Sequence, residues 1–553
     1  MKMSANFVLC ITIALTFCGC LSTSIDQPNT RSVDLAMPPA MMVTPTLGSE
    51  DDSSPVPQDI DLAEYSYKAK KGRDVPPFPP EGILDLSLEQ AVISALGRNR
   101  SLIVEQFNPV IAGTFVETEL AVFDPVFSAQ GSIESFRDRS LDNIAERFFS
   151  IDGNRSLVGA GVAKRFQTGT DVSLDLTLSS RGDDSSERSD EARAGLNLTQ
   201  ALLRNGGVAV NLVGIRRAQA ATLASAYNLR GFAESIVAAA ENAFWDYALA
   251  VRQVEIFQES FQLAQRQLNN IRARIQVGQI AETEESVADA ELALREQQLI
   301  DARSARERTR LNLLRLLNPP SAEGWNRQIT LSEEAVIPEV SLGSVIEHEA
   351  LAIKLRPDLN EARLQARRGE LETVQTANGL LPRLDLFINI GKTGYSQSFG
   401  NGLSDLSGPG YDFAAGLEFE FPQNNRAAMA LDLRARASYQ QALQSIENLR
   451  QLISLDVRNG LLEVERSLQQ IVASASRRVL QEEVVRAETV RFQVGTATAL
   501  DVARVQRDLL ESRINEVEAI VNYRQAITNL YLLDGTLLLR RGIQGPGAEE
   551  VVL

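Results

Sequence analysis

Hydrophobic positions along this chain follow two different periods, and the order in which the periods occur is repeated. Four segments alternate apolar and polar residues at every second position, as strands with one apolar face do: 127–133, 172–178, 192–198 and 413–421. Such runs last about 8 to 11 residues, enough to cross a bilayer as a tilted strand, although a water-soluble sandwich shows the same alternation. The segments between them are long and helical in period, and they are rich in Ala, Gln, Arg and Glu.

The repeated order reflects an internal duplication. The segment 274–278, Arg-Ile-Gln-Val-Gly, recurs as Arg-Phe-Gln-Val-Gly at 491–495, which is 217 positions later. Earlier in each copy the offset is about 257, because Pro125 corresponds to Pro382. The first copy therefore contains roughly 40 extra residues, about the size of one long β-hairpin.

Each copy is predicted to begin with a helix, over 87–122 and over 344–381. Both helices start with a capping-box pattern, in which a serine is followed three residues later by Gln or Glu. The strands follow, and after them a long helix is expected over 207–278 and again over 424–495.

The lengths of these helices are related. A long helix of about 71 residues would span roughly 105 Å, and the helix that returns from it has only about 40 residues. A first helix of about 36 residues makes up the difference, so we expect two shorter helices end to end beside each long one. Such columns leave little core in one chain, which favours lateral association into a ring.

The composition limits where the protein can be located and which partners it can bind. The net charge of −17 disfavours nucleic acid, because phosphates would be repelled. All three cysteines lie within the first 20 residues, beside an apolar run that is typical of a secretory signal. The ending Leu-Thr-Phe-Cys-Gly-Cys at 15–20 resembles a bacterial lipoprotein signal, with lipidation at Cys20; ordinary signal cleavage nearby is the alternative.

The expected organisation follows from these patterns. It comprises a signal peptide (1–19), a lipid-anchored Pro/Ser-rich tether (20–84), a first repeat (85–320), a linker (321–343), a second repeat (344–535) and a C-terminal tail (536–553).

Several motifs, in this order and spacing, resemble those of the outer-membrane efflux factor (TolC-like) family, lipoprotein type. They are Arg-Pro-Asp-Leu at 356–359, Leu-Pro-Arg-Leu at 381–384, Gln-Ala-Leu-Leu-Arg-Asn-Gly-Gly at 200–207 and the two Val-Gly turns. The resemblance implies a mostly α fold with membrane β structure, in which a homotrimer shares one transmembrane β-barrel above a periplasmic α-barrel. It also implies an exit duct for tripartite efflux or type I secretion, with a periplasmic adaptor and an inner-membrane pump as partners.

The resemblance assigns roles to two groups of residues. Val277, Gly278, Val494 and Gly495 correspond to the adaptor-docking tip, although glycine here could simply end a helix. Six residues after each glycine lies an acid, Glu284 and then Asp501, and Asp501 corresponds to the constriction of the closed tip.

Threefold symmetry would turn Asp501 into a ring of three carboxylates that selects cations. The alternative is an exposed acid near a helix N-terminus, which suits the helix dipole. Arg504 stands where relatives carry a second acid, so we expect an Asp501–Arg504 pair at helical spacing.

Chemistry-bearing motifs are scarce. The single histidine, His348, lacks further ligands at a metal-binding spacing, and no phosphate loop or nucleophile motif is present. We therefore predict no enzyme activity, cofactor or metal. The competing hypothesis is a coiled-coil scaffold without a pore, which would explain the helices but not the amphipathic strands.

Overall fold

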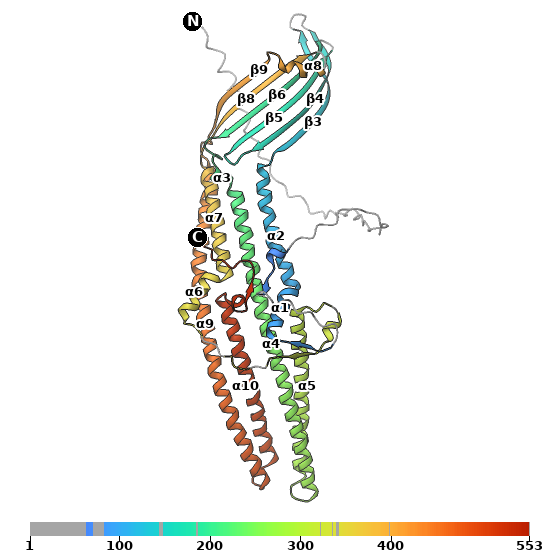
Figure 1. Cartoon of the computed structure of the whole chain (residues 1–553), viewed down its shortest axis with the longest axis vertical. Helices are drawn as coiled ribbons and strands as arrows, with labels where there is room; N and C mark the ends of the chain where they lie inside the picture. Colours follow the sequence, from blue (N-terminus) through green and yellow to red (C-terminus); the bar gives the residue numbers. More distant parts are fainter. Residues whose placement is uncertain are drawn as a thin grey trace, which may run out of the picture. The chain divides into compact units, whose positions relative to one another are not determined.

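A computed structural model of the chain describes residues 62–69, 82–142, 147–183, 186–320, 322–333, 336–338, 342–396 and 399–551. The signal peptide expected over 1–19, Cys20 and most of the tether expected over 20–84 lie outside these residues. Figure 1 shows the arrangement of the described elements.

The first copy contains α1 (Leu88–Arg98), α2 (Arg100–Leu120), η2 (Ala121–Phe123), β3 (Val126–Asp142), β4 (Arg147–Arg165), β5 (Thr170–Asp183), β6 (Ser186–Ala201), α3 (Val208–Asn211), α4 (Val213–Gln276) and α5 (Thr283–Leu317). The second copy contains α6 (Val345–Leu355), α7 (Pro357–Gly379), β8 (Arg383–Ser396), α8 (Phe399–Ser404), η4 (Asp405–Ser407), β9 (Tyr411–Glu420), α9 (Arg426–Gln493) and α10 (Ala499–Leu533). Short elements flank the copies: η1 (Ala63–Tyr65), β1 (Lys68–Ala69), β2 (Leu84–Leu86), η3 (Ala322–Asn326), β7 (Ile329–Leu331), α11 (Leu537–Arg540) and β10 (Ile543–Gln544).

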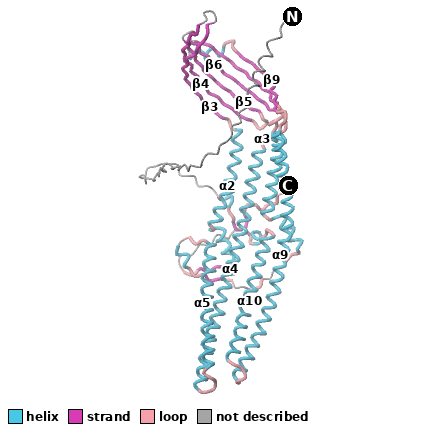
Figure 2. Tube along the Cα trace, turned by 180° about the vertical axis from the view of Figure 1, so that it is seen from behind, coloured by secondary structure: helices cyan, strands magenta, loops and turns pink. Residues whose placement is uncertain are grey.

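The expected match of helix lengths is confirmed. α4 has 64 residues and α9 has 68, whereas the returning helices α5 and α10 have 35 each. α4 packs along α5 and also along α1 and α2, and α9 packs along α10 and also along α6 and α7 (Figures 1 and 2). Each long helix is therefore accompanied over its length by shorter helices.

The first helix of each copy differs from the prediction, because the helices expected over 87–122 and 344–381 are each broken into two. Asn99 is extended, and its side chain accepts hydrogen bonds from the backbone N–H groups of Ser101 and Leu102. Arg356 is also non-helical, since the following Pro357 disfavours the α conformation in the residue before it. Both predicted capping boxes, which begin the first helix of each pair, are confirmed.

The two breaks receive the ends of the returning helices. Asn318, which ends α5 in the left-handed conformation, donates from Nδ2 to the carbonyl oxygen of Arg98 at 2.9 Å. In the second copy Gly535 follows α10 with φ of +69°, and a Cβ there would lie 3.0 Å from the backbone nitrogen of Arg356. The same junction is thus built twice, and the second one requires glycine.

The strands form one antiparallel sheet of six, in the order β3-β4-β5-β6-β8-β9. Four strands come from the first copy and two from the second, so the extra residues of the first copy form two additional strands. The strands contain 10 to 19 residues and most exceed the predicted 8 to 11. The prediction was too short because the strict apolar alternation covers only part of each strand.

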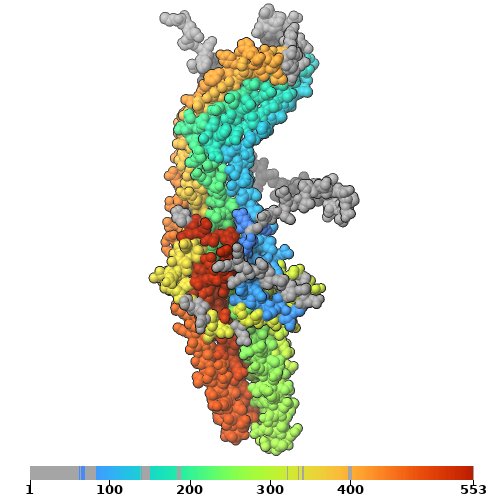
Figure 3. Space-filling model, in the orientation of Figure 1, coloured from blue at the N-terminus to red at the C-terminus, as the bar shows by residue number. Residues whose placement is uncertain are grey.

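The segments expected as a tether and as a C-terminal tail contribute to the helical body. β1 pairs with β10, and Tyr67 is buried with its ring against Gly545. Leu537 and Leu538 of α11 are also buried, and Figure 3 shows the C-terminal residues lying over the middle of the helices. These elements are too short to give a periodic signal in the sequence.

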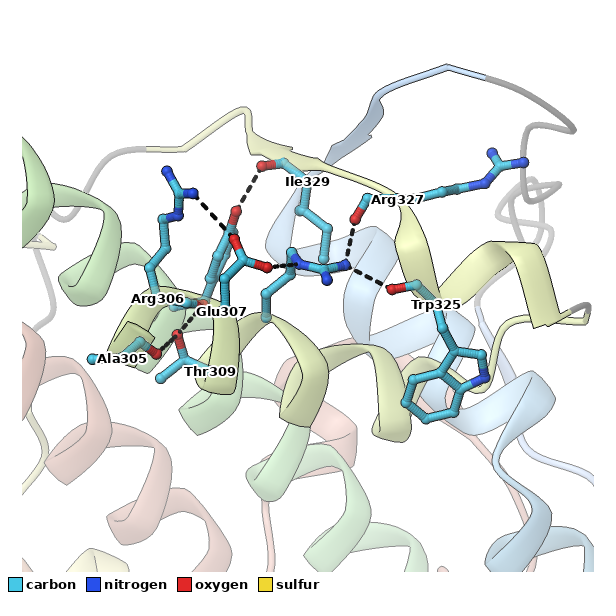
Figure 4. Close-up of polar contacts among 9 residues, drawn as sticks. Ala305, Arg306, Glu307, Thr309, Trp325, Arg327 and Ile329 are labelled. Atoms are coloured by element: carbon cyan, nitrogen blue, oxygen red, sulfur yellow. Dashed lines mark hydrogen bonds and ion pairs between the residues drawn. The ribbon is translucent and has the colours of Figure 1, made fainter. Parts of the chain in front are cut away.

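The segment between the copies is held on α5 and α4 by side chains that donate to its backbone (Figure 4). Arg310 donates from Nη1 to the carbonyl oxygens of Trp325, at 2.8 Å, and Arg327, at 2.6 Å. The Tyr247 hydroxyl donates to the carbonyl oxygen of Ile329 at 2.8 Å. β7 then pairs in parallel with β2, which joins this segment to the start of the first copy.

Buried charged groups lie where α4 meets the C-terminal residues. Glu241 is fully buried and accepts hydrogen bonds from Thr528 and Arg541. Arg230 pairs with Glu234 at 3.1 Å, and both side chains are nearly inaccessible.

A second buried pair joins the two ends of the second copy. His348, expected only as a routine helix position, lies 2.8 Å from the buried Asp534 through Nδ1. The sequence gave no sign of this contact, because the two residues are separated by 186 positions.

Glu234 should make the stability of the protein depend on pH. Burial raises the pKa of Glu234 to about 7, although Arg230 opposes the shift. The folded state therefore holds this proton more tightly than the unfolded state. The contribution of Glu234 to folding stability is fully present below the ordinary pKa of 4.5 and is lost as the pH rises through about 7. From about pH 5 to pH 8 we expect wild type to lose on the order of 3 kcal/mol through this group, and Glu234→Gln to lose less.

Thermal unfolding midpoints across this pH range would measure the effect. Glu259→Gln, an exposed position in the same helix, is the matched control and should keep the wild-type slope. An unchanged slope in Glu234→Gln would contradict the prediction.

Candidate functional sites: the helical turns and the sheet

Both long helices end in the same hydrogen-bonded turn, at the end of the helix away from its strands. Gly278 has φ of +70° and donates to the carbonyl oxygen of Ile275, and Gln279 donates to that of Arg274, each at 2.9 Å. This is the Schellman pattern, and Gly495, with φ of +80°, begins an equivalent turn. A Cβ at either glycine would meet no atom within 4 Å, so the backbone conformation alone requires glycine.

The residues before these glycines are exposed valines. Val277 is 67% exposed and Val494 is 69% exposed, although both are large apolar side chains. The predicted turns are therefore present, and each presents one valine to its surroundings. Their role in docking stays a prediction.

The ends of the two helical hairpins are packed together. Leu268 and Ile271 of α4 are buried in one cluster with Ala288 of α5 and Ala499 of α10. Across the hairpins, the guanidinium carbon of Arg274 lies 5.4 Å from the centre of the Phe492 ring. The two turns therefore belong to one connected structure.

Asp501 is bound by its own helix start. Its carboxylate accepts from the hydroxyl of Thr498 at 2.7 Å and from the backbone N–H of Thr498 at 3.0 Å. These hydrogen bonds hold the pKa of Asp501 below its usual range, and Arg504 and Arg491 add smaller contributions. The expected Asp501–Arg504 pair is not formed, because the carboxylate is engaged by Thr498 while Arg504 is exposed.

Glu284, the equivalent acid in the first copy, has a different partner. Its Oε2 accepts from the backbone N–H of Ala499 at 3.1 Å, so it caps the start of α10 in the other hairpin. Sequence reasoning missed this contact because the two residues are 215 positions apart. Both acids therefore cap the N-terminus of α10. Asp501 belongs to α10 itself, whereas Glu284 belongs to α5 of the other hairpin.

Removing the carboxylate of Glu284 should loosen the start of α10. We expect Glu284→Ala to leave the N–H of Ala499 without its partner, at a cost of about 1 kcal/mol locally. Hydrogen exchange at the first turn of α10 should become several-fold faster, whereas Glu284→Gln, which keeps an acceptor oxygen, should largely preserve protection.

Glu285→Ala is the matched control, because Glu285 bonds to Arg272 rather than to α10. If Glu284→Ala left the exchange of α10 unchanged, the cap would have no energetic role.

The sheet has one apolar and one polar face, and the strand register keeps each face continuous. Phe127 lies opposite Val162, and Leu174 lies opposite both Val162 and Leu196. Exposed apolar residues on this face are Phe127, Ile133, Val158, Leu174, Leu176, Leu196, Ile390, Phe413, Leu417 and Phe419. The other face carries Ser128, Gln130, Asp171, Asp175, Arg193, Asn197, Asn389, Asp412, Glu418 and Glu420.

A sheet with one exposed apolar face and one polar face is typical of strands that separate lipid from a water-filled lumen. Among the described residues, no helix combines the length and the apolar character that crossing a bilayer requires. The fold and the sheet together define a membrane channel protein with long helical hairpins.

The sequence places this channel in a family. Residues 164–319 and 350–536, more than half of the chain, match the family described as outer membrane efflux protein. The chain belongs to this family, and it is an outer-membrane efflux channel with a periplasmic helical part, not an enzyme. Channels of the family form trimers. The hypothesis of a scaffold without a pore is thereby set aside.

Solved structures agree on the fold. CmeC, the outer-membrane channel of Campylobacter jejuni, is 15% identical, with a TM-score of 0.56 over 87% of this chain and 94% of its own. The open MtrE channel of Neisseria gonorrhoeae is 18% identical, with a TM-score of 0.56 over 86% and 96%. CusC is 14% identical, with a TM-score of 0.60 over 85% and 99%. A comparison with curated protein sequences gives no match.

Proposed function

We propose that three copies of this chain close into one duct, which passively conducts substrates from a periplasmic adaptor and an inner-membrane pump to the exterior, in tripartite efflux or type I secretion. The observation that carries this proposal is the six-stranded sheet, whose apolar face is continuous while the outer edges of β3 and β9 have no partner strand among the described residues. Unsatisfied backbone groups in lipid cost several kcal/mol each, so both edges require a partner.

The helical edges support the same association. Residues of α9 that lie on one side of the helix are exposed and apolar: Leu433, Leu455, Leu462, Leu480 and Val484. At the opposite edge α2 exposes Val104, Ile111 and Phe115 at helical spacing. Because the two edges differ, association is head to tail, and a closed ring satisfies every edge.

The adaptor would bind at the turns that contain Val277, Gly278, Val494 and Gly495. Two exposed valines on equivalent hydrogen-bonded turns form a repeated apolar surface at the end of the helices, which suits a partner with several equivalent subunits. The pump would supply the energy for export, because channels of this family are not enzymes. The family resemblance, rather than geometry, connects this surface to an adaptor.

A charge on both turns should uncouple the duct from its partners. We expect Val277→Asp combined with Val494→Asp to abolish export in cells while leaving trimers in the outer membrane, because only the exposed apolar contact is lost. Ile346→Asp is the control, since Ile346 is equally exposed on α6, far from the turns in sequence. Normal export by the double variant would rule out docking through these valines.

Asp501 is proposed as the gate residue, with Glu284 and Arg504 nearby. In a trimer three Asp501 carboxylates would surround the axis at the narrow end and bind cations. The lowered pKa of Asp501 supports this role, since the carboxylate would stay ionised at neutral pH.

Single-channel recordings of purified trimers would test the gate. Asp501→Asn removes the charge but keeps an oxygen that can cap α10, whereas Asp501→Ala removes both. We expect both variants to lose block by divalent cations, and only Asp501→Ala to leak more at rest. Wild-type block in both variants would exclude Asp501 from the gate.

Lipid anchoring through Cys20 is also part of the proposal, supported by the cysteine-containing end of the signal segment. The mass of the mature N-terminal peptide would show whether it is acylated.

A further inference from the structure

The additional strands of the first copy determine how wide the exit is. We propose that β3 and β4 belong to the barrel wall, that β3 pairs with β9 of the next protomer, and that the trimer therefore forms an eighteen-stranded barrel from three six-stranded sheets. This inference rests on the proposed function and specifies the width of the exit through which the duct would release its substrates.

The first argument is the chemistry of the β3–β4 hairpin. Its apolar side chains, such as Phe127 and Val158, lie on the same face as those of β5, and the pairing of β4 with β5 runs from Gly153 to Arg165. A flap in water would not need an apolar face that continues the apolar face of its neighbours. On this face Ile133 and Ser156 are directly opposite each other, and beyond them most residues of β3 and β4 are polar or charged, although Phe148, which is 68% exposed, lies on the same face nearer the end of the hairpin.

Beyond that level the face that is apolar lower in the hairpin carries charge. Arg137 and Asp152, which are opposite each other on this face, form an ion pair at 2.6 Å. Charged pairs of this kind are compatible with water outside a bilayer and not with its hydrocarbon. The hairpin therefore has a lipid-facing part at the height of the other strands and a water-facing extension.

The second argument is the width of the two walls. Near the sheet, each protomer has four helix columns side by side, because α2 packs on α4, α4 on α7 and α7 on α9. Four helices at about 9 Å spacing span about 36 Å. Six strands at about 4.8 Å spacing and a tilt of about 40° span about 38 Å. With all six strands in the wall, the barrel is as wide as the ring of helices.

The third argument is that the polar face is open. The connection between β8 and β9 packs on the apolar side of the sheet, since a Cβ on Gly402 would lie 3.5 Å from the Cβ of Ala192. Ala192 is opposite Leu178 on the apolar face. Within the described part of the chain, no helix packs on the polar face, and barrels of 16 to 18 strands leave an aqueous channel.

The family match is consistent with an addition. It begins at residue 164, so it includes β5, β6, β8 and β9 but excludes β3 and nearly all of β4. The hairpin is thus a feature of this chain that the shared part of the family does not require.

Disulfide cross-linking in the outer membrane would test the strand count. All native cysteines lie in residues 10–20, so introduced pairs report without interference. Each chain would carry Ala414→Cys on the polar face of β9 and one cysteine on β3 or β5, also on the polar face. Single β3 positions are Ser128, Gln130 and Ser132, and the matched β5 positions are Ser173, Asp175 and Thr177.

In an eighteen-stranded barrel, at least one β3 position should yield covalent dimers and trimers, about tenfold more than any β5 position, because disulfides require close Cβ atoms. If β5 positions cross-link and β3 positions do not, the barrel closes without the hairpin; that outcome overturns this inference and leaves the duct intact. Absence of links from every position in chains that remain trimeric also overturns it.

A pair within the chain serves as control. Asn197→Cys and Asn389→Cys are register partners on β6 and β8, and their thiols should disappear on oxidation in any barrel. If this control forms but no chain is trimeric, the proposed function fails together with the inference.

Discussion

The unpaired backbone at the two edges of the sheet is the constraint on which the rest of the molecule depends. A sheet whose apolar face meets lipid cannot leave N–H and C=O groups without partners, and one chain cannot close a six-stranded sheet on itself as arranged here. The helices also require neighbouring protomers. Their exposed apolar residues lie on α2 and α9, the helices that continue the two edges of the sheet. Association is therefore a condition of the fold in the membrane and not an addition to it.

The duplication explains how one chain provides a continuous wall. In each copy a returning helix ends at the break between two shorter helices, and this junction keeps the columns in contact along the long helix. The copies have since diverged in detail: Asn318 closes one junction through its side chain, while Gly535 closes the other through close backbone contact. The same divergence is seen at the turns, where Asp501 caps its own helix and Glu284 caps the helix of the other copy.

The middle of the helices is where the copies are fixed to each other. Glu241 and Arg541 join the middle of α4 to the C-terminal residues, and Arg230 donates to the carbonyl oxygens of Gly535 and Gly547. Buried charges are costly unless they are paired, so these contacts specify one arrangement more than they add stability.

The sequence by itself determined the long helices, the approximate match of their lengths and the place of the strands between them. The period of apolar residues predicted helices and strands, and the serine capping boxes predicted where the first helices start, because both depend on neighbours within a few residues. The repeat at an offset of 217 predicted two equivalent turns, because the same short local sequence occurs in each copy. Asn99 and Arg356 could have been identified as breaks only by weighing a capping side chain and a following proline against a strong helical pattern. The tertiary structure alone decided the contact of Glu284 with Ala499, the burial of His348 on Asp534, the pairing of β1 with β10 and the place of β3 and β4 in the sheet. These contacts join residues far apart in the chain or in elements of two or three residues, and no local period encodes a partner at such a distance.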